Sequence, residues 1–144
     1  GADLSDADLT GVISGKITGT PTLPSGYKMA NGFIVCPFAD PSNADIYGAS
    51  LLDANLSCID LTGADLDGAD LNNADLTGVI SGNITGTPTL PSGYKMVDGK
   101  IVGPGEDVDL ADLRGIDITG ADLTGVIIAD ANRTGAIPSG AHTA

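Results

Sequence analysis

A five-residue period constrains the fold of this chain more than any other feature of its sequence. Across residues 44–77 a small apolar residue is followed by Asp or Asn, then by Leu or Ile, then by two mostly polar or small residues. An α-helix would place its apolar residues three and four positions apart, and a half-buried strand would alternate with a period of two. A five-residue unit fits neither pattern, and indicates a short extended piece followed by a corner.

The two apolar residues of each unit are two positions apart, so both point to the same side of the extended piece. The Asp or Asn between them points outward, where it can accept a backbone hydrogen bond in an Asx-turn. Four corners close a square of 20 residues, and successive squares stack at the ~4.8 Å spacing of neighbouring strands. The sequence therefore predicts an all-β coil with residues stacked 20 apart around a narrow lumen. The predicted core is Leu51, Leu56, Leu61, Leu66, Leu71, Leu76, Ala64, Ala69 and Ala74.

These A(D/N)LXX units, of which ADLDG, ADLNN and ADLT at residues 64–77 are the clearest, resemble the pentapeptide-repeat family. The resemblance covers roughly two-thirds of the chain and implies a right-handed quadrilateral β-helix, a form of solenoid. We expect residues 1–144 to form one such domain.

A longer repeat overlies the short one. Residues 7–37 and 74–104 match at 26 of 31 positions, and a decayed third copy at 121–140 matches 74–93 at 11 of 20 positions. The first interval is 67 residues and the second is 47, so they differ by 20, one coil of the proposed square. This difference supports the 20-residue coil independently of the five-residue pattern.

Each full copy contains a predicted β-hairpin, because Asn-Gly is the preferred pair for a type I′ turn and Asp-Gly also favours it. The predicted turns are Asn31-Gly32 and Asp98-Gly99. We expect the inserts, at about 20–43 and 87–105, to bulge from the coil at the same corner, which would allow the hairpins to stack on each other. A C-terminal tail is expected at about 134–144.

The aromatic residues of the hairpins are the best candidates for a contact patch on a protein partner, and the alternative is that they pack against the coil wall. They are Tyr27, Phe33 and Tyr94.

Few residues suggest chemistry. The single His142 lies in a Gly/Ser/Ala-rich tail, and no convergent set of polar groups remains for catalysis, so we expect neither enzyme activity nor a cofactor. Outward carboxylates such as Asp45 and Asp65 should lie one coil apart, where Ca²⁺ could bridge them, but Asx-turn capping and solubility account for them without a metal ion. Cys36 and Cys58 are expected as free thiols, with a disulfide as the alternative.

The composition of the chain limits the classes of partner that it can bind. The 19 acidic and 6 basic residues give a net charge of −13, which argues against direct nucleic-acid binding. No apolar stretch is long enough for a membrane span.

The resemblance implies a bacterial source, and the missing initiator Met suggests a processed or excerpted chain. The compartment stays open, an exported or extracellular location included.

The leading expectation for function is a non-enzymatic structural or protein-interaction module. A β-helix carries unpaired strand edges at its ends, and the repeat begins at Ala2 without a capping helix, so self-association through coil ends into a fibre is one form of this hypothesis. A partner protein not identified by the sequence is another. The resemblance implies one alternative function, an acidic mimic of DNA that binds a type II topoisomerase such as gyrase.

Overall fold

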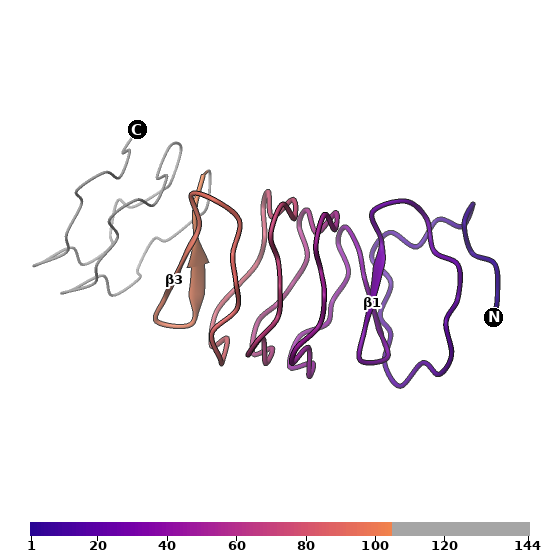
Figure 1. The fold of residues 1–144 in the computed structure, drawn as a ribbon, viewed down its shortest axis with the longest axis horizontal. Coiled ribbons are helices and arrows are strands. Elements are labelled where there is room, and N and C mark those ends of the chain that lie inside the picture. The colour runs from indigo at the N-terminus through magenta and orange to yellow at the C-terminus, as the bar shows by residue number, and fades with distance from the viewer. Residues whose placement is uncertain (105–144) are drawn as a thin grey trace, which may run out of the picture.

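The computed structural model describes residues 1–104, which wind as stacked turns of chain along one axis (Figure 1). Within this range the strands are β1 (Lys28–Ala30), β2 (Phe33–Val35), β3 (Lys95–Val97) and β4 (Lys100–Val102), and there is no helix. The third repeat copy, the tail at about 134–144 and His142 lie outside the described residues.

Successive turns of the chain are joined by isolated parallel bridges rather than by long strands. Residues 20 apart form these bridges, with one bridge for each five-residue unit: Asp45 to Asp65, Ser50 to Asp70, Asn55 to Asp75, Asp60 to Ile80, and Asp65 to Thr85. Around one bridge, the N–H of Leu51 donates to the carbonyl of Asp70 at 2.8 Å, and the N–H of Asp70 donates to that of Ala49 at 2.9 Å. Because each extended piece is so short, a single residue on each side of the coil forms a bridge to the next turn.

The corners have the geometry of type II turns. The N–H of Ala49 donates to the carbonyl of Ile46 at 3.2 Å, and the third residue of this turn, Gly48, has a φ of 63°. Asp45 Oδ1 accepts the N–H of Tyr47 at 3.1 Å, which is the Asx-turn expected from the sequence. The same contact recurs at Asn55, Asp60, Asp65, Asp70 and Asp75. The outward carboxylates therefore cap the corners of the coil.

The lumen is filled by the inward residues of the five-residue units. All six predicted Leu residues are at most 1% exposed, Ala64 and Ala69 are fully buried, and Ala74 is 7% exposed. Because Ala leaves space for the Leu side chains from the other sides of the coil, these residues pack together in one buried core.

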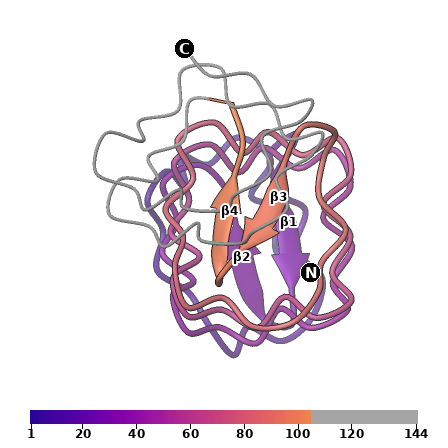
Figure 2. The same ribbon diagram turned by 90° about the vertical axis from the view of Figure 1, so that its left-hand side faces the viewer.

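The two hairpins lie inside the coil. Strand β1 pairs antiparallel with β2, and β3 pairs antiparallel with β4. Viewed along the axis, all four strands lie within the outline of the coil (Figure 2). Their inner residues are buried with the lumen residues: Ala30, Ile34, Val35, Val97, Ile101 and Val102.

This placement corrects two expectations. The hairpins do not bulge outward, because their apolar residues gain more burial across the lumen than on the surface. They also do not stack on each other, because the turns of residues 44–85 lie between them, and β1–β2 makes no contact with β3–β4 (Figure 1). The coil still continues into each insert, since Thr22 bridges to Asp3 and Thr89 bridges to Asp70.

Candidate functional site

The hairpins are held in the lumen by serine residues that replace an inward Leu. Ser14 Oγ accepts the N–H of Ile34 in β2 at 2.8 Å, and Ser81 Oγ accepts the N–H of Ile101 in β4 at 3.0 Å. Counting in fives from Leu76 places Ser81 at the next inward position. The small side chain leaves room for a strand, and its hydroxyl satisfies a backbone donor that would otherwise be buried without a partner. Ser14 and Ser81 were not predicted as functional residues, although each interrupts the run of inward Leu residues at five-residue spacing.

The hairpin tips form part of the coil wall. Asn31 and Gly32 have φ values of 46° and 89°, and Asp98 and Gly99 have 48° and 74°, so both central residues of each turn are left-handed, as a type I′ turn requires. The carbonyl of Gly32 accepts the N–H of Ile17 at 3.0 Å, and Gly99 accepts that of Ile84 at the same distance. Each hairpin therefore spans the lumen to reach the wall.

The tip of the first hairpin is also fixed to the following turn. Asn31 Nδ2 donates to the carbonyl of Tyr47 at 3.0 Å and to that of Asp45 at 3.2 Å. We call this pair of contacts the Asn31 clasp. It joins the first hairpin to the coil stacked on it.

The three hairpin aromatic residues that were candidates for a contact patch do not project from the surface. Tyr27, Phe33 and Tyr94 are half-buried and pack against the hydrophobic core. A Cβ added to Gly15 would lie 3.1 Å from the Phe33 ring, which shows how closely this ring meets the neighbouring turn.

Other large apolar residues are exposed instead, among them Ile13 at 80%, Phe38 at 58% and Ile80 at 52%. Ile13 and Ile80 occupy equivalent positions in the two repeat copies, and Ile80 bridges to Asp60, at an outward position where most units carry Asp or Asn.

These three residues lie on one side of the coil. Backbone hydrogen bonds join Gly11 to Pro37, Phe38 to Ser57, and Ile80 to Ile59, so segments 11–13, 37–40, 57–60 and 77–80 are neighbours. We call this surface the isoleucine wall. It combines exposed apolar residues with the carboxylates of Asp40 and Asp60.

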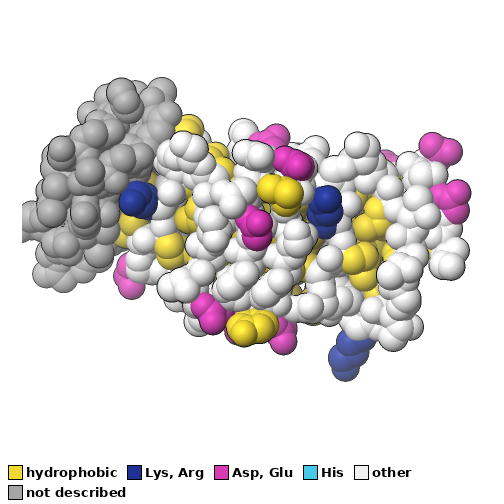
Figure 3. All heavy atoms as spheres, viewed as in Figure 1, with side chains coloured by type: hydrophobic (Ala, Val, Ile, Leu, Met, Phe, Trp, Pro, Cys, Tyr) yellow, Lys and Arg dark blue, Asp and Glu magenta, His cyan; other side chains and the backbone are white. Residues whose placement is uncertain are grey.

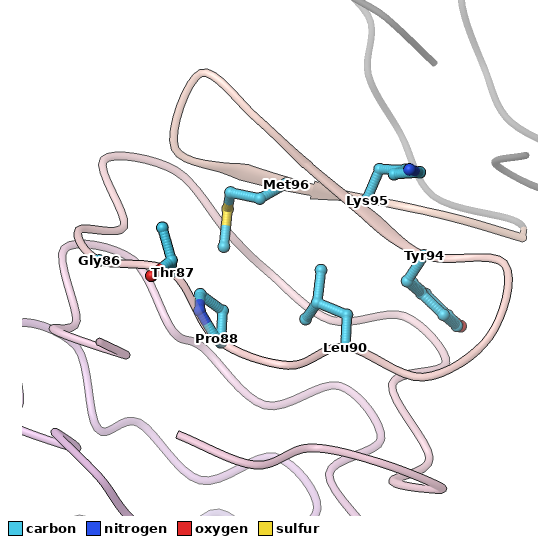
Figure 4. A pocket seen from close by; sticks show the side chains of 7 residues that line it. All are labelled: Gly86, Thr87, Pro88, Leu90, Tyr94, Lys95 and Met96. Atoms are coloured by element: carbon cyan, nitrogen blue, oxygen red, sulfur yellow. The ribbon is translucent and has the colours of Figure 1, made fainter. Parts of the chain in front are cut away.

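A shallow groove of about 450 Å³ lies beside β3 (Figure 4). It is lined by Gly86, Thr87, Pro88, Leu90, Tyr94, Lys95 and Met96. Its floor is apolar, with the Lys95 amine at the rim (Figure 4).

The carboxylates show no metal centre. Acidic side chains are scattered along the face drawn in Figure 3, with separate apolar patches between them. Over residues 1–104 no group of three or more His, Cys, Asp or Glu is placed to hold a metal ion. Hydrogen bonds from the Ser42 hydroxyl and N–H lower the pKa of the Asp40 carboxyl, and Ser5 lowers that of Asp3 in the same way.

Both cysteines are free. Cys36 is buried, its Sγ lies 3.4 Å from the carbonyl of Leu9, and burial raises the pKa of its thiol. Cys58 lies half-buried at a corner with a φ of 56°. No helix among the described residues is long and apolar enough to cross a membrane.

Comparison with known proteins agrees with the repeat geometry. A family model described as pentapeptide repeats matches residues 44–80 in eight copies. Residues 44–80 are pentapeptide repeats. The matched units coincide with the bridged turns between the two hairpins, so the pentapeptide repeats form the β-helix.

A solved structure is also similar: HetL, a pentapeptide-repeat protein involved in heterocyst differentiation regulation from the cyanobacterium Nostoc sp. strain PCC 7120. The two chains are 24% identical, with a TM-score of 0.28. The match covers 99% of this chain and 51% of HetL, so this chain spans about half the length of that protein. The comparison with curated proteins gave no match.

Proposed function

We propose that this pentapeptide-repeat protein is a non-enzymatic interaction module, and that the isoleucine wall is the surface that binds a protein partner. The observation that carries this proposal is the exposure of Ile13 and Ile80 at equivalent outward positions of the two repeat copies. Asp and Asn at most other outward positions cap a corner, whereas an exposed Ile makes no such contribution to the coil. Exposed apolar patches mark binding surfaces, and exposed Phe38 lies on the same side of the coil as Ile13 and Ile80.

The polar side chains of the coil support a non-enzymatic role. The carboxylates of Asp45, Asp65 and Asp70 each accept the N–H two residues further along the chain. The hydroxyls of Ser14 and Ser81 accept hydrogen bonds from the hairpins. These groups stabilise the corners and the lumen. Their hydrogen bonds have structural roles, and this supports a function other than catalysis.

The experiment compares the wild-type chain with the Ile13→Ser/Ile80→Ser variant. Each is cross-linked in an extract of the source cells, and the captured proteins are quantified by mass spectrometry. We expect one or more proteins to be captured by the wild type and depleted with the variant. The matched control is Leu52→Ser, which also removes an apolar side chain, 40% exposed, from a corner outside the isoleucine wall. Equal capture by all three proteins would reject the isoleucine wall as the binding surface.

A more specific form of the proposal is that the β-helix is the right-handed, four-sided coil of its family and associates end to end. Support comes from the pairing between turns, which uses backbone groups and so could continue into another molecule. The N–H of Asp65 donates to Ala44 of the preceding turn at 2.9 Å, and Asp3 occupies the same place in the first described turn.

Light scattering against concentration tests this form. Open-ended growth that Asp3→Pro abolishes would support it, because Pro removes the N–H that would donate to the next molecule. A constant mass at all concentrations would reject it.

The net charge of the chain favours a second candidate function, in which the protein mimics DNA and binds gyrase. Outward Asp residues stack in columns, as Asp45 does with Asp65, and the net charge is −13. Inhibition of supercoiling by gyrase would support this function, and inactivity at micromolar concentration would remove it.

A further inference from the structure

Phe38 occupies a corner conformation that a bulky side chain rarely adopts. The N–H of Ala39 donates to the carbonyl of Cys36 at 3.1 Å, so residues 36–39 form one turn, with Pro37 second and Phe38 third. Phe38 has a φ of 60° at this third position, where a type II turn favours Gly or Asn. For a bulky residue this conformation is an outlier that carries strain.

The corners on either side of Phe38 carry smaller residues at the same place. The N–H of Phe38 donates to the carbonyl of Ser57 at 3.0 Å, so Phe38 lies beside Cys58 of the next turn. A Cβ added to Gly11 would lie 3.8 Å from the Phe38 carbonyl oxygen, and one added to Gly78 would lie 3.0 Å from the Cys58 sulfur. The coil therefore forms this corner without an aromatic ring in three other turns.

The strained ring is also exposed. Phe38 is 58% exposed, and it belongs neither to the buried core nor to the residues packed against that core. Phe33, the other Phe of the chain, does pack against the core. Among the described residues, the strain at Phe38 is thus not offset by burial of its side chain.

Carboxylates lie next to this corner. Asp40 follows Phe38 at an exposed outward position, and the N–H of Asp60 donates to the carbonyl of Ala39 at 3.0 Å, which places Asp60 beside Asp40. The four segments of the isoleucine wall contain no Lys or Arg. A second copy of this chain would bring the same carboxylates against them, and like charges facing each other disfavour association. Lys and Arg side chains on a different protein would complement this surface.

We propose that Phe38 is the anchor of the isoleucine wall, the side chain that enters an apolar pocket of a partner protein, and that Lys or Arg side chains at the rim of that pocket pair with Asp40 and Asp60. This inference rests on the proposed function and names the chemistry of the partner. Aromatic side chains in desolvated pockets contribute much of the binding energy of protein interfaces. Binding would supply the burial that Phe38 lacks in the coil.

The first test places the photo-reactive residue benzoylphenylalanine at position 38 of the full chain and irradiates it in an extract of the source cells. The control has the same residue at position 47, because Tyr47 is an exposed aromatic at a corner outside the isoleucine wall. We expect attachment from position 38, but not from position 47, to one partner protein at apolar residues that Lys or Arg side chains flank. Absence of attachment, equal attachment from both positions, attachment to a second copy, or an attached site without basic neighbours would each overturn the proposal.

The second test separates binding from stability. Phe38→Asn removes the ring and places at the corner a residue that tolerates a positive φ, and Tyr47→Asn is the matched control. Phe38→Asn should have a thermal midpoint equal to that of the wild type or up to about 5 °C higher. Its affinity for the purified partner, measured by titration calorimetry, should be weaker by about tenfold or more, whereas Tyr47→Asn should bind like the wild type.

Two results of this titration would reject the anchor. A lower midpoint of Phe38→Asn with unchanged affinity would assign Phe38 to the stability of the coil. Wild-type binding that does not weaken as the salt concentration rises would exclude the pairing of Asp40 and Asp60 with basic side chains.

Capture from the extract also distinguishes failure of this inference from failure of the proposed function. Loss of the partner with Ile13→Ser/Ile80→Ser, but not with Phe38→Asn, would mean that the isoleucine wall binds and that Phe38 is not its anchor. Equal capture by the wild type and both variants would reject the wall and the anchor together.

Discussion

The hydroxyl oxygen of Ser14 lies 2.8 Å from the backbone nitrogen of Ile34, and this contact explains how a narrow coil can contain a hairpin. An inward Leu at this position would fill the space that β2 occupies, and it would leave the N–H of Ile34 without an acceptor. Ser81 and Ile101 repeat the arrangement 67 residues further on. One substitution in the pentapeptide pattern thus changes both the available volume and the hydrogen bonding of the lumen.

Replacing either serine should destabilise the protein. Ser14→Ala or Ser81→Ala leaves a buried backbone donor unsatisfied, and we expect a loss of about 1–3 kcal/mol in the free energy of unfolding. Urea denaturation measures the change. Ser92→Ala is the control, because Ser92 is exposed and its loss should change stability by less than about 0.5 kcal/mol. Equal stability of Ser14→Ala and Ser92→Ala would show that the hydroxyl does not support β2.

The regular part of the fold can be predicted directly from the sequence, because the residues of each five-residue unit determine the local structure of that unit. The spacing of Ala64 and Leu66 fixes the inward side, Asp65 caps the corner through the N–H of Asp67, and Gly68 supplies the left-handed residue. These effects are local, so a single unit is enough to predict them.

The placement of the hairpins could not be predicted in the same way. Asn31-Gly32 identifies a turn but does not say whether the strands point outward or across the lumen. That outcome depends on long-range burial of Val35 and on an acceptor, Ser14, that lies 20 residues before its donor. For the same reason the sequence could not decide whether Tyr27 and Phe33 form a contact patch or pack against the coil wall, and the structure shows that they pack against the core.

Enlarging an inward alanine should overpack the lumen. Ala69 is fully buried, and Ala69→Leu should lower the free energy of unfolding by about 1–3 kcal/mol, because the added carbons have no space to enter. Thermal unfolding followed by circular dichroism measures the change. Thr77→Leu places the same side chain at an exposed corner, where it has space, and should be nearly neutral. If both variants unfold at the wild-type temperature, the lumen is less tightly packed than its burial indicates.

Relieving backbone strain at a corner should stabilise the protein. Cys58 has a φ of 56°, a conformation that costs a side-chain-bearing residue roughly 1–2 kcal/mol. Part of this gain is offset by the greater backbone freedom of Gly in the unfolded chain. We therefore expect Cys58→Gly to raise the free energy of unfolding by up to about 1 kcal/mol, measured by urea denaturation.

A coupled substitution makes this prediction specific to the corner. A Cβ on Gly78 would lie 3.0 Å from the Cys58 sulfur, so Gly78→Ala should be destabilising. The loss should be smaller in the Cys58→Gly background, because only the strain at the positive φ of Gly78 remains. Identical losses in the two backgrounds would mean that residues 58 and 78 do not meet.

The two thiols should differ in reactivity. Cys36 is fully buried and its thiol has a raised pKa, so little reactive thiolate is available at neutral pH, whereas Cys58 is half-buried at a corner. Alkylation of the native protein, followed by peptide mass spectrometry, should modify Cys58 well before Cys36. Both should react at similar rates in denaturant, and faster labelling of Cys36 in the native state would contradict its burial.

Acid should weaken the corner that Asp40 caps. Because hydrogen bonds from Ser42 lower the pKa of this carboxyl below its ordinary value of 3.8, folding favours the carboxylate. Its contribution to stability is therefore fully present above pH 3.8 and is lost as the pH falls through the lower, folded pKa. Asp40→Asn keeps an oxygen acceptor but cannot ionise, so its stability should fall less steeply with acid than that of the wild type. Ser42→Ala removes one donor and should give an intermediate slope, measured as the free energy of unfolding between pH 2 and pH 6. Parallel curves for the three proteins would show that the Asp40 carboxylate is not coupled to folding.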